Sequence, residues 1–145
     1  MSVKNIMSSS VVAVDMDDAL GKVKKLFEEN GFHHLLVTQS GRLMGVISDR
    51  DLLKSISHNV GTVREKSADT ATLKKRVHQI MTRKPISVEP SASIYEAVAI
   101  FNEHKISCIP VVDEQNRPVG IISWRDIIRV LEKQWGAESR RAATV

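Results

Sequence analysis

The stretch Gly45-Val46-Ile47-Ser48-Asp49-Arg50-Asp51 returns later in the chain as Gly120-Ile121-Ile122-Ser123-Trp124-Arg125-Asp126. In each copy an apolar run, typical of a buried strand, ends in Ser-x-Arg-Asp and continues into an apolar helical pattern. The two stretches therefore predict two equivalent strand-to-helix corners. Each corner displays a hydroxyl, a guanidinium and a carboxylate, a set of groups that can hold a nucleotide.

The repeat extends well beyond these two stretches. Ile6-Met7 aligns with Ile80-Met81, Phe27 with Phe101 and Val37 with Val111, and one inserted residue near Asn116 brings the corners into register. The repeated blocks, about 6–56 and 80–131, cover most of the chain, which indicates a duplication.

Each block shows the same order of elements, β-α-β-β-α. A short strand (11–14 or 86–88) precedes a helix whose apolar residues have the spacing of one buried stripe, and two more strands and a closing helix follow. The paired strands are expected at 35–38 and 43–48 in the first block and at 108–112 and 119–123 in the second. The closing helices are expected to start near Arg50 and Arg125. Between the blocks, a short helix is expected from Leu73 to Met81.

Local signals support the helix ends. Ser93 and Glu96 have the spacing of a capping box, and Asn30-Gly31 is a stop signal for the first helix. The predicted fold class is α/β (α+β). Because a unit of this size cannot bury both faces of its sheet, the two repeats are expected to pack sheet to sheet in a pseudo-two-fold arrangement.

The predicted domains follow the duplication. Repeat 1 spans 1–57, a polar linker spans 58–73, repeat 2 spans 74–135, and a flexible tail spans 136–145. The hydrophobic share of 42% and the charged share of 26% are those of an ordinary globular protein and exclude general disorder.

The amino terminus has no basic leader with an apolar segment, and no apolar run is long enough to span a membrane, so the expected location is cytoplasmic and no membrane partner is expected. The single cysteine, Cys108, rules out an internal disulfide, and its apolar surroundings predict an inert core thiol. The net charge of +4 is modest and scattered, and no aromatic residues interleave with the basic ones. Nucleic-acid binding is therefore the weakest reading of the charge.

The residues resemble a tandem pair of cystathionine-β-synthase (CBS) domains, also called a Bateman module. The likeness is carried by the two Ile-Met openings, by Cys108-Ile109-Pro110-Val111-Val112, and by the two Gly-h-h-Ser-x-x-Asp segments, where h is apolar. It spans nearly the whole chain. The chain is thus similar to a stand-alone CBS-domain protein.

The resemblance implies a regulatory, ligand-sensing module that binds an adenosine-containing ligand in clefts between the repeats. The ligand class includes AMP, ADP, ATP, S-adenosylmethionine and dinucleotides, and no cofactor is required. By position, Asp51 and Asp126 would hold ribose hydroxyls, assisted by Ser48 and Ser123, and a carboxylate suits a vicinal diol because it accepts two hydrogen bonds. Arg50 and Arg125 add a charged fork for phosphate.

Further contacts in the first site are expected from residues near the first two strands, which are Val12, His33, His34 and Leu35. In the second site they are expected from Thr82, Lys84, Pro85, Ile86, Ser107, Cys108, Ile109 and Pro110. The second site carries more basic charge and is favoured as the tighter phosphate binder. The resemblance also implies a homodimer through the closing helices, with 50–57 and 125–135 as interface candidates, and an unidentified protein target.

Two alternatives remain open: a structural or oligomerisation module without a ligand and, more weakly, nucleic-acid binding. Ser-x-x-Asp before an apolar helix is itself a capping signal, so the motif acids can serve the helices alone in a structural or oligomerisation module without a ligand. Metal binding by His33-His34 is not favoured, because adjacent residues on a strand point to opposite faces. No catalytic triad or phosphate loop stands out, so the chain is not expected to be an enzyme.

Overall fold

The computed structural model describes residues 1–143, which form two compact units. The first-motif unit is Val12–Pro85 and contains the corner Ser48 to Asp51. The second-motif unit combines Met1–Val11 with the chain from Ile86 onward and contains the corner Ser123 to Asp126. The mixed α+β class predicted from the sequence is confirmed, and the β-α-β-β-α order is present in full in the first-motif unit.

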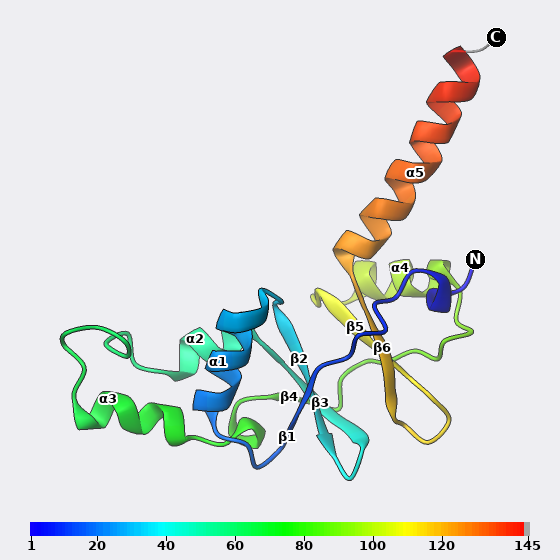
Figure 1. The fold of residues 1–145 in the computed structure, drawn as a ribbon. Coiled ribbons are helices and arrows are strands. Elements are labelled where there is room, and N and C mark those ends of the chain that lie inside the picture. Colours follow the sequence, from blue (N-terminus) through cyan, green and yellow to red (C-terminus); the bar gives the residue numbers. More distant parts are fainter. Residues whose placement is uncertain (144–145) are drawn as a thin grey trace. The chain divides into compact units, whose positions relative to one another are not determined.

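A four-stranded sheet forms the first-motif unit, in the order β1-β2-β3-β4 (Figure 1). The strands are β1 (Ala13–Asp15), β2 (His34–Gln39), β3 (Arg42–Ser48) and β4 (Thr82–Arg83). Strand β1 runs parallel to β2, and the other neighbours are antiparallel. The helices of this unit are α1 (Leu20–Asn30), α2 (Asp49–Ser55) and α3 (Ser67–Ala71), with 3₁₀ turns η2 (Thr72–Lys74) and η3 (Val77–Gln79).

Helix α1 shows how the local sequence sets an element. Its predicted stripe places Leu20 and Val23 in the core, with Phe27 packed against it. The helix ends at Gly31, which adopts φ 67° and donates its N–H to the Phe27 carbonyl. Since this left-handed conformation disfavours residues with a Cβ, the predicted stop at Asn30-Gly31 is confirmed.

The second-motif unit repeats this plan with a shorter sheet. Its hairpin is β5 (Cys108–Val112) and β6 (Pro118–Ser123), and its helices are η1 (Val3–Asn5), α4 (Ile94–Glu103) and α5 (Trp124–Ala143). Single bridges replace the flanking strands: Val88 pairs with Val111 in parallel and Ser8 with Ile121 in antiparallel. The strand expected at 86–88 is therefore reduced to one bridge. The cap of α4 is as predicted, because Ser93 Oγ accepts the Glu96 N–H at 3.1 Å.

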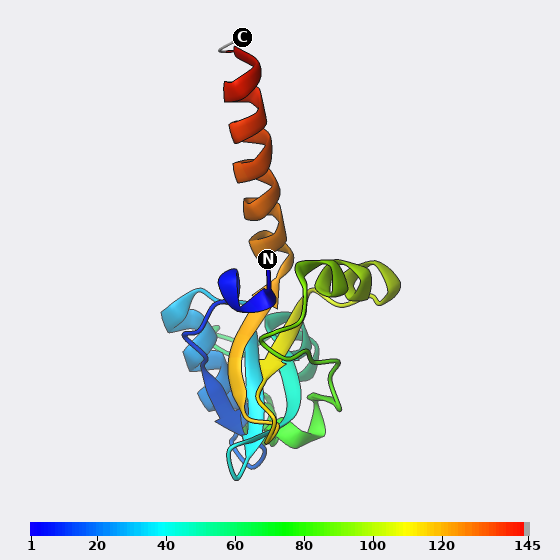
Figure 2. The ribbon, with the colours of Figure 1, turned by 90° about the vertical axis from the view of Figure 1, so that its right-hand side faces the viewer.

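The opening of each repeat packs in the other repeat's unit. Residues 1–11 lie along β6 in Figure 2, and Ser8 and Ile121 exchange backbone hydrogen bonds of 3.0 Å. Likewise β4, which follows the second Ile-Met, pairs with β3 of the first-motif unit. The predicted boundaries at 57 and 74 follow chain order, whereas the units in space exchange these openings.

This exchange explains the glycine in each repeated stretch. A Cβ on Gly45 would lie 2.7 Å from both Met81 Sδ and the Thr82 carbonyl oxygen, and a Cβ on Gly120 would collide with Met7. Each methionine thus covers a glycine of the central hairpin. Only glycine leaves the space that the Ile-Met opening occupies.

The segment between the repeats differs from the expectation. The helix expected from Leu73 to Met81 is wrong, because Lys75 and Arg76 adopt extended backbone between the two 3₁₀ turns η2 and η3. Helix α3 lies inside the predicted linker. At the carboxyl end α5 continues to Ala143, through most of the predicted tail, while residues 144–145 lie outside the described residues.

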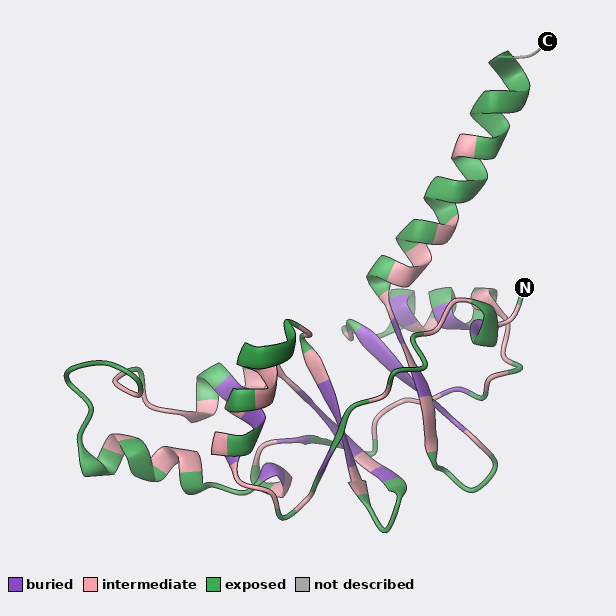
Figure 3. Ribbon diagram, viewed as in Figure 1, coloured by how far each residue is buried: buried purple, intermediate pink, exposed green. Residues whose placement is uncertain are grey.

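Each unit has its own apolar core, seen as the buried strands in Figure 3. The first core includes Leu20, Leu35, Val37, Ile47 and Val77, all fully buried. The second contains Val3, Ala97, Ile109, Val111 and Ile122, also fully buried. By contrast, no described residue of α5 is buried.

Candidate ligand-binding corners

Each corner lies at the end of the central hairpin of its unit. Strand β3 ends at Ser48, opposite His34, and α2 begins at the next residue. Strand β6 ends at Ser123, opposite Cys108, and α5 begins at the next residue. The parallel neighbour starts at the same end, because Ala13 pairs with Leu36 and Val88 with Val111. Strand ends and a helix start therefore meet at one end of each sheet.

The first corner is a complete capping box. Asp51 Oδ2 accepts the Ser48 N–H at 2.9 Å, and Ser48 Oγ accepts the Asp51 N–H at 3.0 Å. A second pair joins this corner to the start of β2: the Asp49 N–H donates to the His33 carbonyl at 3.0 Å, and His33 Nδ1 lies 2.8 Å from Asp49 Oδ2. The carboxylate of Asp51 thus serves helix α2 in the way that the capping alternative predicts.

The second corner is tied differently. Asp126 Oδ2 accepts the Ser123 N–H at 2.8 Å and lies 3.2 Å from Ser123 Oγ, while Asp126 Oδ1 lies 3.6 Å from Arg129 Nη1. The indole Nε1–H of Trp124 donates to the Ile106 carbonyl at 3.1 Å, and its ring packs against Phe101 with centroids 6.1 Å apart. At the first position of the helix, the second corner therefore has a bond from Trp124 to Ile106, where the first corner has a bond between Asp49 and His33.

Most of the predicted site residues gather at these sheet ends. Val12 is level with Leu35 in the parallel register, and its carbonyl accepts the Leu36 N–H at 3.3 Å. The first-motif unit brings together Val12, His33, His34, Leu35, Ser48, Arg50 and Asp51. The second-motif unit holds Ile86, Ser107, Cys108, Ile109, Pro110, Ser123, Arg125 and Asp126.

Several of these side chains face the core. Leu35, Ile109 and Pro110 are fully buried, so that mainly their backbone is open to a ligand. Cys108 is buried too, and burial raises the pKa of its thiol to about 12. The thiol stays protonated at neutral pH, in agreement with the predicted inert core cysteine.

Thr82, Lys84 and Pro85 belong to the first-motif unit, whereas Ser123 belongs to the second-motif unit. Thr82 pairs with Val46, and the Lys84 N–H donates to the Met44 carbonyl at 3.4 Å. Lys84 has φ 48°, an uncommon conformation for a residue with a side chain. Their part in a site with Asp126 stays a prediction.

The histidine pair differs in its surroundings. His33 is exposed, whereas His34 is half-buried, and burial lowers the pKa of His34 although Asp49 and Asp51 act in the opposite direction. Within the part of the chain that the structure describes, no group of three or more His, Cys, Asp or Glu side chains is placed to hold a metal ion.

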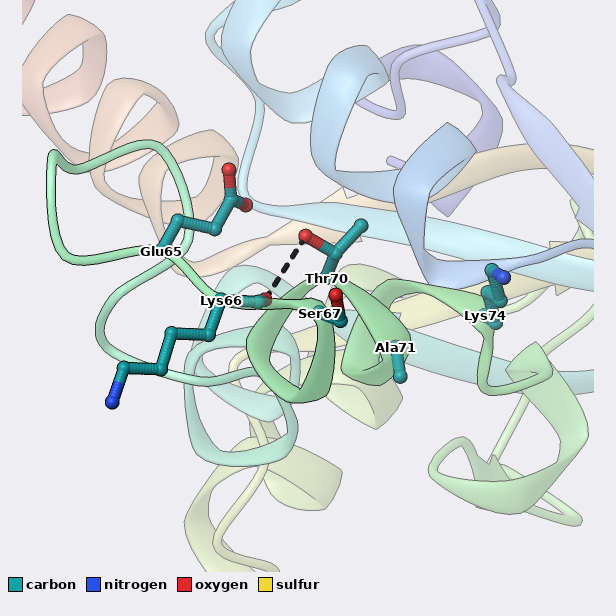
Figure 4. A pocket seen from close by; sticks show the side chains of 6 residues that line it. All are labelled: Glu65, Lys66, Ser67, Thr70, Ala71 and Lys74. Atoms are coloured by element: carbon teal, nitrogen blue, oxygen red, sulfur yellow. Dashed lines mark hydrogen bonds between the residues drawn. The ribbon is translucent and has the colours of Figure 1, made fainter.

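Two hollows are lined by none of the site residues predicted from the sequence. One, of about 480 Å³, is lined by Glu65, Lys66, Ser67, Thr70, Ala71 and Lys74 around α3 (Figure 4). The other, of about 310 Å³, is an apolar groove between α4 and α5, lined by Val98, Phe101, Asn102, Trp124, Ile127, Ile128 and Leu131. The groove shares Trp124 with the second corner.

Three features were not predicted from the sequence. They are the cover of Gly45 and Gly120 by methionine, the hydrogen bond between His33 and Asp49, and the contact of Asp126 with Arg129. The aligned Ile-Met openings were the available signal for the first, since they repeat together with the glycine. The spacing of Asp126 and Arg129 on one helix was the signal for the third.

Comparison with known proteins identifies relatives over nearly the whole chain. Residues 3–58 and 77–133 match the family described as CBS domain. A CBS domain-containing protein of Dictyostelium discoideum is 30% identical over 133 residues, 90% of this chain and 91% of that protein. The CBS domain pair of protein MJ0100, solved in complex with 5′-methylthioadenosine and S-adenosyl-L-methionine, is 25% identical with a TM-score of 0.76, covering 92% of this chain and 98% of that one.

Some relatives are much longer than this chain. The L-aspartate semialdehyde sulfurtransferase of Methanosarcina acetivorans is 25% identical over 134 residues, which are 92% of this chain but 24% of that enzyme. The likeness to the enzyme is limited to that part. Among residues 1–143, no helix is long and apolar enough to cross a membrane.

Proposed function

The chain belongs to the CBS domain family, and we propose that it is a regulatory module that binds an adenosine-containing ligand at each of its two corners. The likeness to the CBS domain pair of protein MJ0100, whose structure holds two adenosine derivatives, carries this proposal. It is supported by the duplicated corner, which repeats a serine and a carboxylate at the same end of each sheet. CBS domain pairs are in general regulatory and not catalytic.

In this proposal Asp51 and Asp126 bind the ribose hydroxyls. The cap that each acid makes with the serine N–H uses one acceptor position on Oδ2, and an ionised carboxylate offers about four. Asp51 Oδ1 has no hydrogen-bond partner among the described residues, and Asp126 Oδ1 has only the longer contact with Arg129. Capping and ribose binding are thus compatible in one side chain.

The base would lie against the strand starts beside each corner. In the first-motif unit these are Val12, His33, His34 and Leu35, of which Val12 and His33 are exposed. In the second-motif unit they are Ile86, Ser107, Cys108, Ile109 and Pro110, of which Ser107 is exposed. Thr82, Lys84 and Pro85 would add to the second site.

The downstream effect requires a partner. A ligand changes the behaviour of the module only if it binds two of its states unequally, and the module then acts on an unidentified protein target.

The proposed assembly is a homodimer through α5. Trp124, Ile128, Leu131 and Trp135 are exposed large apolar residues spaced four, three and four residues apart, the spacing of a coiled-coil seam. An identical helix is a partner of matching shape for such a stripe.

A thermal-shift panel of adenosine, AMP, ATP and S-adenosylmethionine tests the proposal. A ligand at 100 times its dissociation constant adds about 2.7 kcal/mol of stability, which raises the melting temperature by several degrees. Asp126→Asn keeps an oxygen acceptor for the Ser123 N–H but loses the charge and lone pairs for ribose, so the shift from its site should disappear. Ser93→Ala, which removes the cap of α4, is the control for lost stability without lost binding.

The rival is a module in which the motif acids only cap their helices. A specific observation favours it, since both acids do accept the serine N–H. This rival predicts no thermal shift with any of the four compounds at millimolar concentration. It also predicts that Asp126→Asn and Ser93→Ala differ only in stability.

A further inference from the structure

We infer that the first corner selects an adenosine ligand without a phosphate, whereas the second accepts one that carries a phosphate, and that Asp49 makes this distinction. The inference rests on the proposed function and adds the ligand class of each site. Three differences between the corners support it. They are the residue that begins the helix, the number of first helical N–H groups that already have an acceptor, and the local charge.

The first helical residue is Asp49 in α2 and Trp124 in α5. This position is next to the motif serine, where the helix start would otherwise attract the phosphate of a ligand. The Asp49 carboxylate places a negative charge there, about half exposed and held by His33 at 2.8 Å. Trp124 brings no charge, and its indole is bound to the Ile106 carbonyl.

The N–H groups at the helix starts also differ. In the first corner the Asp49 N–H donates to the His33 carbonyl and the Asp51 N–H to Ser48 Oγ. In the second corner the N–H groups of Trp124, Arg125 and Asp126 have no acceptor within residues 1–143. Three donors of a 20-residue helix are therefore open to an anion, whereas in the first corner two of the three are occupied.

The local charge differs. The first corner holds two carboxylates, Asp49 and Asp51, against Arg50 and Lys54, which leaves no net charge. In the second corner Arg125 and Arg129 stand against one carboxylate, Asp126, with Arg129 Nη1 at 3.6 Å from it. The second corner thus carries one more net positive charge and attracts a phosphate dianion more strongly than the first, while neutral adenosine meets no such difference.

Isothermal titration of the wild-type protein with adenosine and AMP, which differ only by the phosphate, tests the inference. Adenosine should bind two sites per chain with similar affinity. AMP should bind one site tightly and the other at least tenfold more weakly, and the tight site should be lost in Asp126→Asn. The gap between the two AMP sites should shrink as sodium chloride is raised from 50 to 500 mM, because exposed charges are screened.

Asp49→Asn should strengthen the weak AMP site by roughly tenfold, since it removes one negative charge beside the phosphate. Asp17→Asn makes the same change in net charge on an exposed residue beyond the other end of β1 and should leave both AMP sites unchanged. Equal strengthening by the two variants, or two equal AMP sites in the wild type, would overturn the inference. A single adenosine site in the wild type that persists in Asp51→Asn would also overturn the inference, because the first corner would then bind no adenosine. Absence of binding by either compound would instead overturn the proposed function.

Discussion

Met81 lies directly over Gly45, so that a Cβ on that glycine would be 2.7 Å from the methionine sulfur. Met7 covers Gly120 in the same way. The opening of each repeat is thus fastened to the central hairpin of the other repeat's unit. The contact requires a missing side chain on one partner and a flexible one on the other.

Gly120→Ala should therefore destabilise the protein by about 1–3 kcal/mol, the usual cost of forcing an extra carbon into a packed site. Urea unfolding measures the change. Gly136→Ala is the matched control, because a Cβ at Gly136 meets only Arg140 at 3.8 Å and lies inside helix α5. The control should gain up to about 1 kcal/mol from helix propensity. Equal stability of the two variants would refute the close contact.

Cys108 should be unreactive in the folded protein. Burial raises the pKa of its thiol to about 12, so at pH 8 almost no thiolate is present to attack a disulfide reagent. Ellman's reagent should label the native protein very slowly and label one thiol per chain in urea. The double variant Ser107→Cys/Cys108→Ser moves the thiol to the exposed neighbour and should react within minutes. Rapid labelling of the native wild type would show that β5 is not buried.

His34 should make the protein sensitive to mild acid. Burial lowers the pKa of His34 below its ordinary value of 6.5, so the unfolded chain binds a proton more readily than the folded one. The stability that the neutral imidazole contributes is complete above pH 6.5 and is lost as the pH falls through the pKa of the folded state. Urea midpoints at pH 7.5 and 5.5 should therefore fall less in His34→Gln than in the wild type. His58→Gln, at an exposed position, should keep the wild-type loss.

The proposed dimer depends on the exposed stripe of α5. Trp135→Glu places a charge in the stripe and should turn the dimer into a monomer in light scattering coupled to gel filtration. Gln134→Glu adds the same charge at the neighbouring exposed position and should leave the dimer intact. A monomeric wild type at 100 µM would contradict the proposed assembly.

Local sequence patterns predicted the features that depend on residues close together in the chain. Strand β5 has the predicted bounds, the stop at Gly31 is present, and the Ser93 cap forms as expected. The corners at Ser48 and Ser123 were found as strand-to-helix junctions. Each of these depends on residues within a few positions of one another, where periodicity and caps carry the signal.

Contacts between distant segments were not predictable in this way. The periodicity of residues 73–81 favoured a helix, but Leu20 donates its N–H to the Lys75 carbonyl and Val77 to the Asp18 carbonyl, which holds this segment extended beside α1. The exchange of the openings and the different ties of Asp49 and Trp124 likewise depend on tertiary pairing. The binding roles of the corner residues remain proposals for the same reason, because a capping acid and a ribose-binding acid have the same sequence pattern.

Titration of adenosine compounds into the wild type and into Asp51→Asn/Asp126→Asn shows directly whether the two motif acids bind a ligand. Both substitutions retain an oxygen acceptor for the serine N–H, so the helix caps and the fold should persist, as circular dichroism can verify. We expect measurable binding heat with the wild type and none with the double variant. Equal binding by the two proteins, or no binding by the wild type at millimolar ligand, would contradict this expectation.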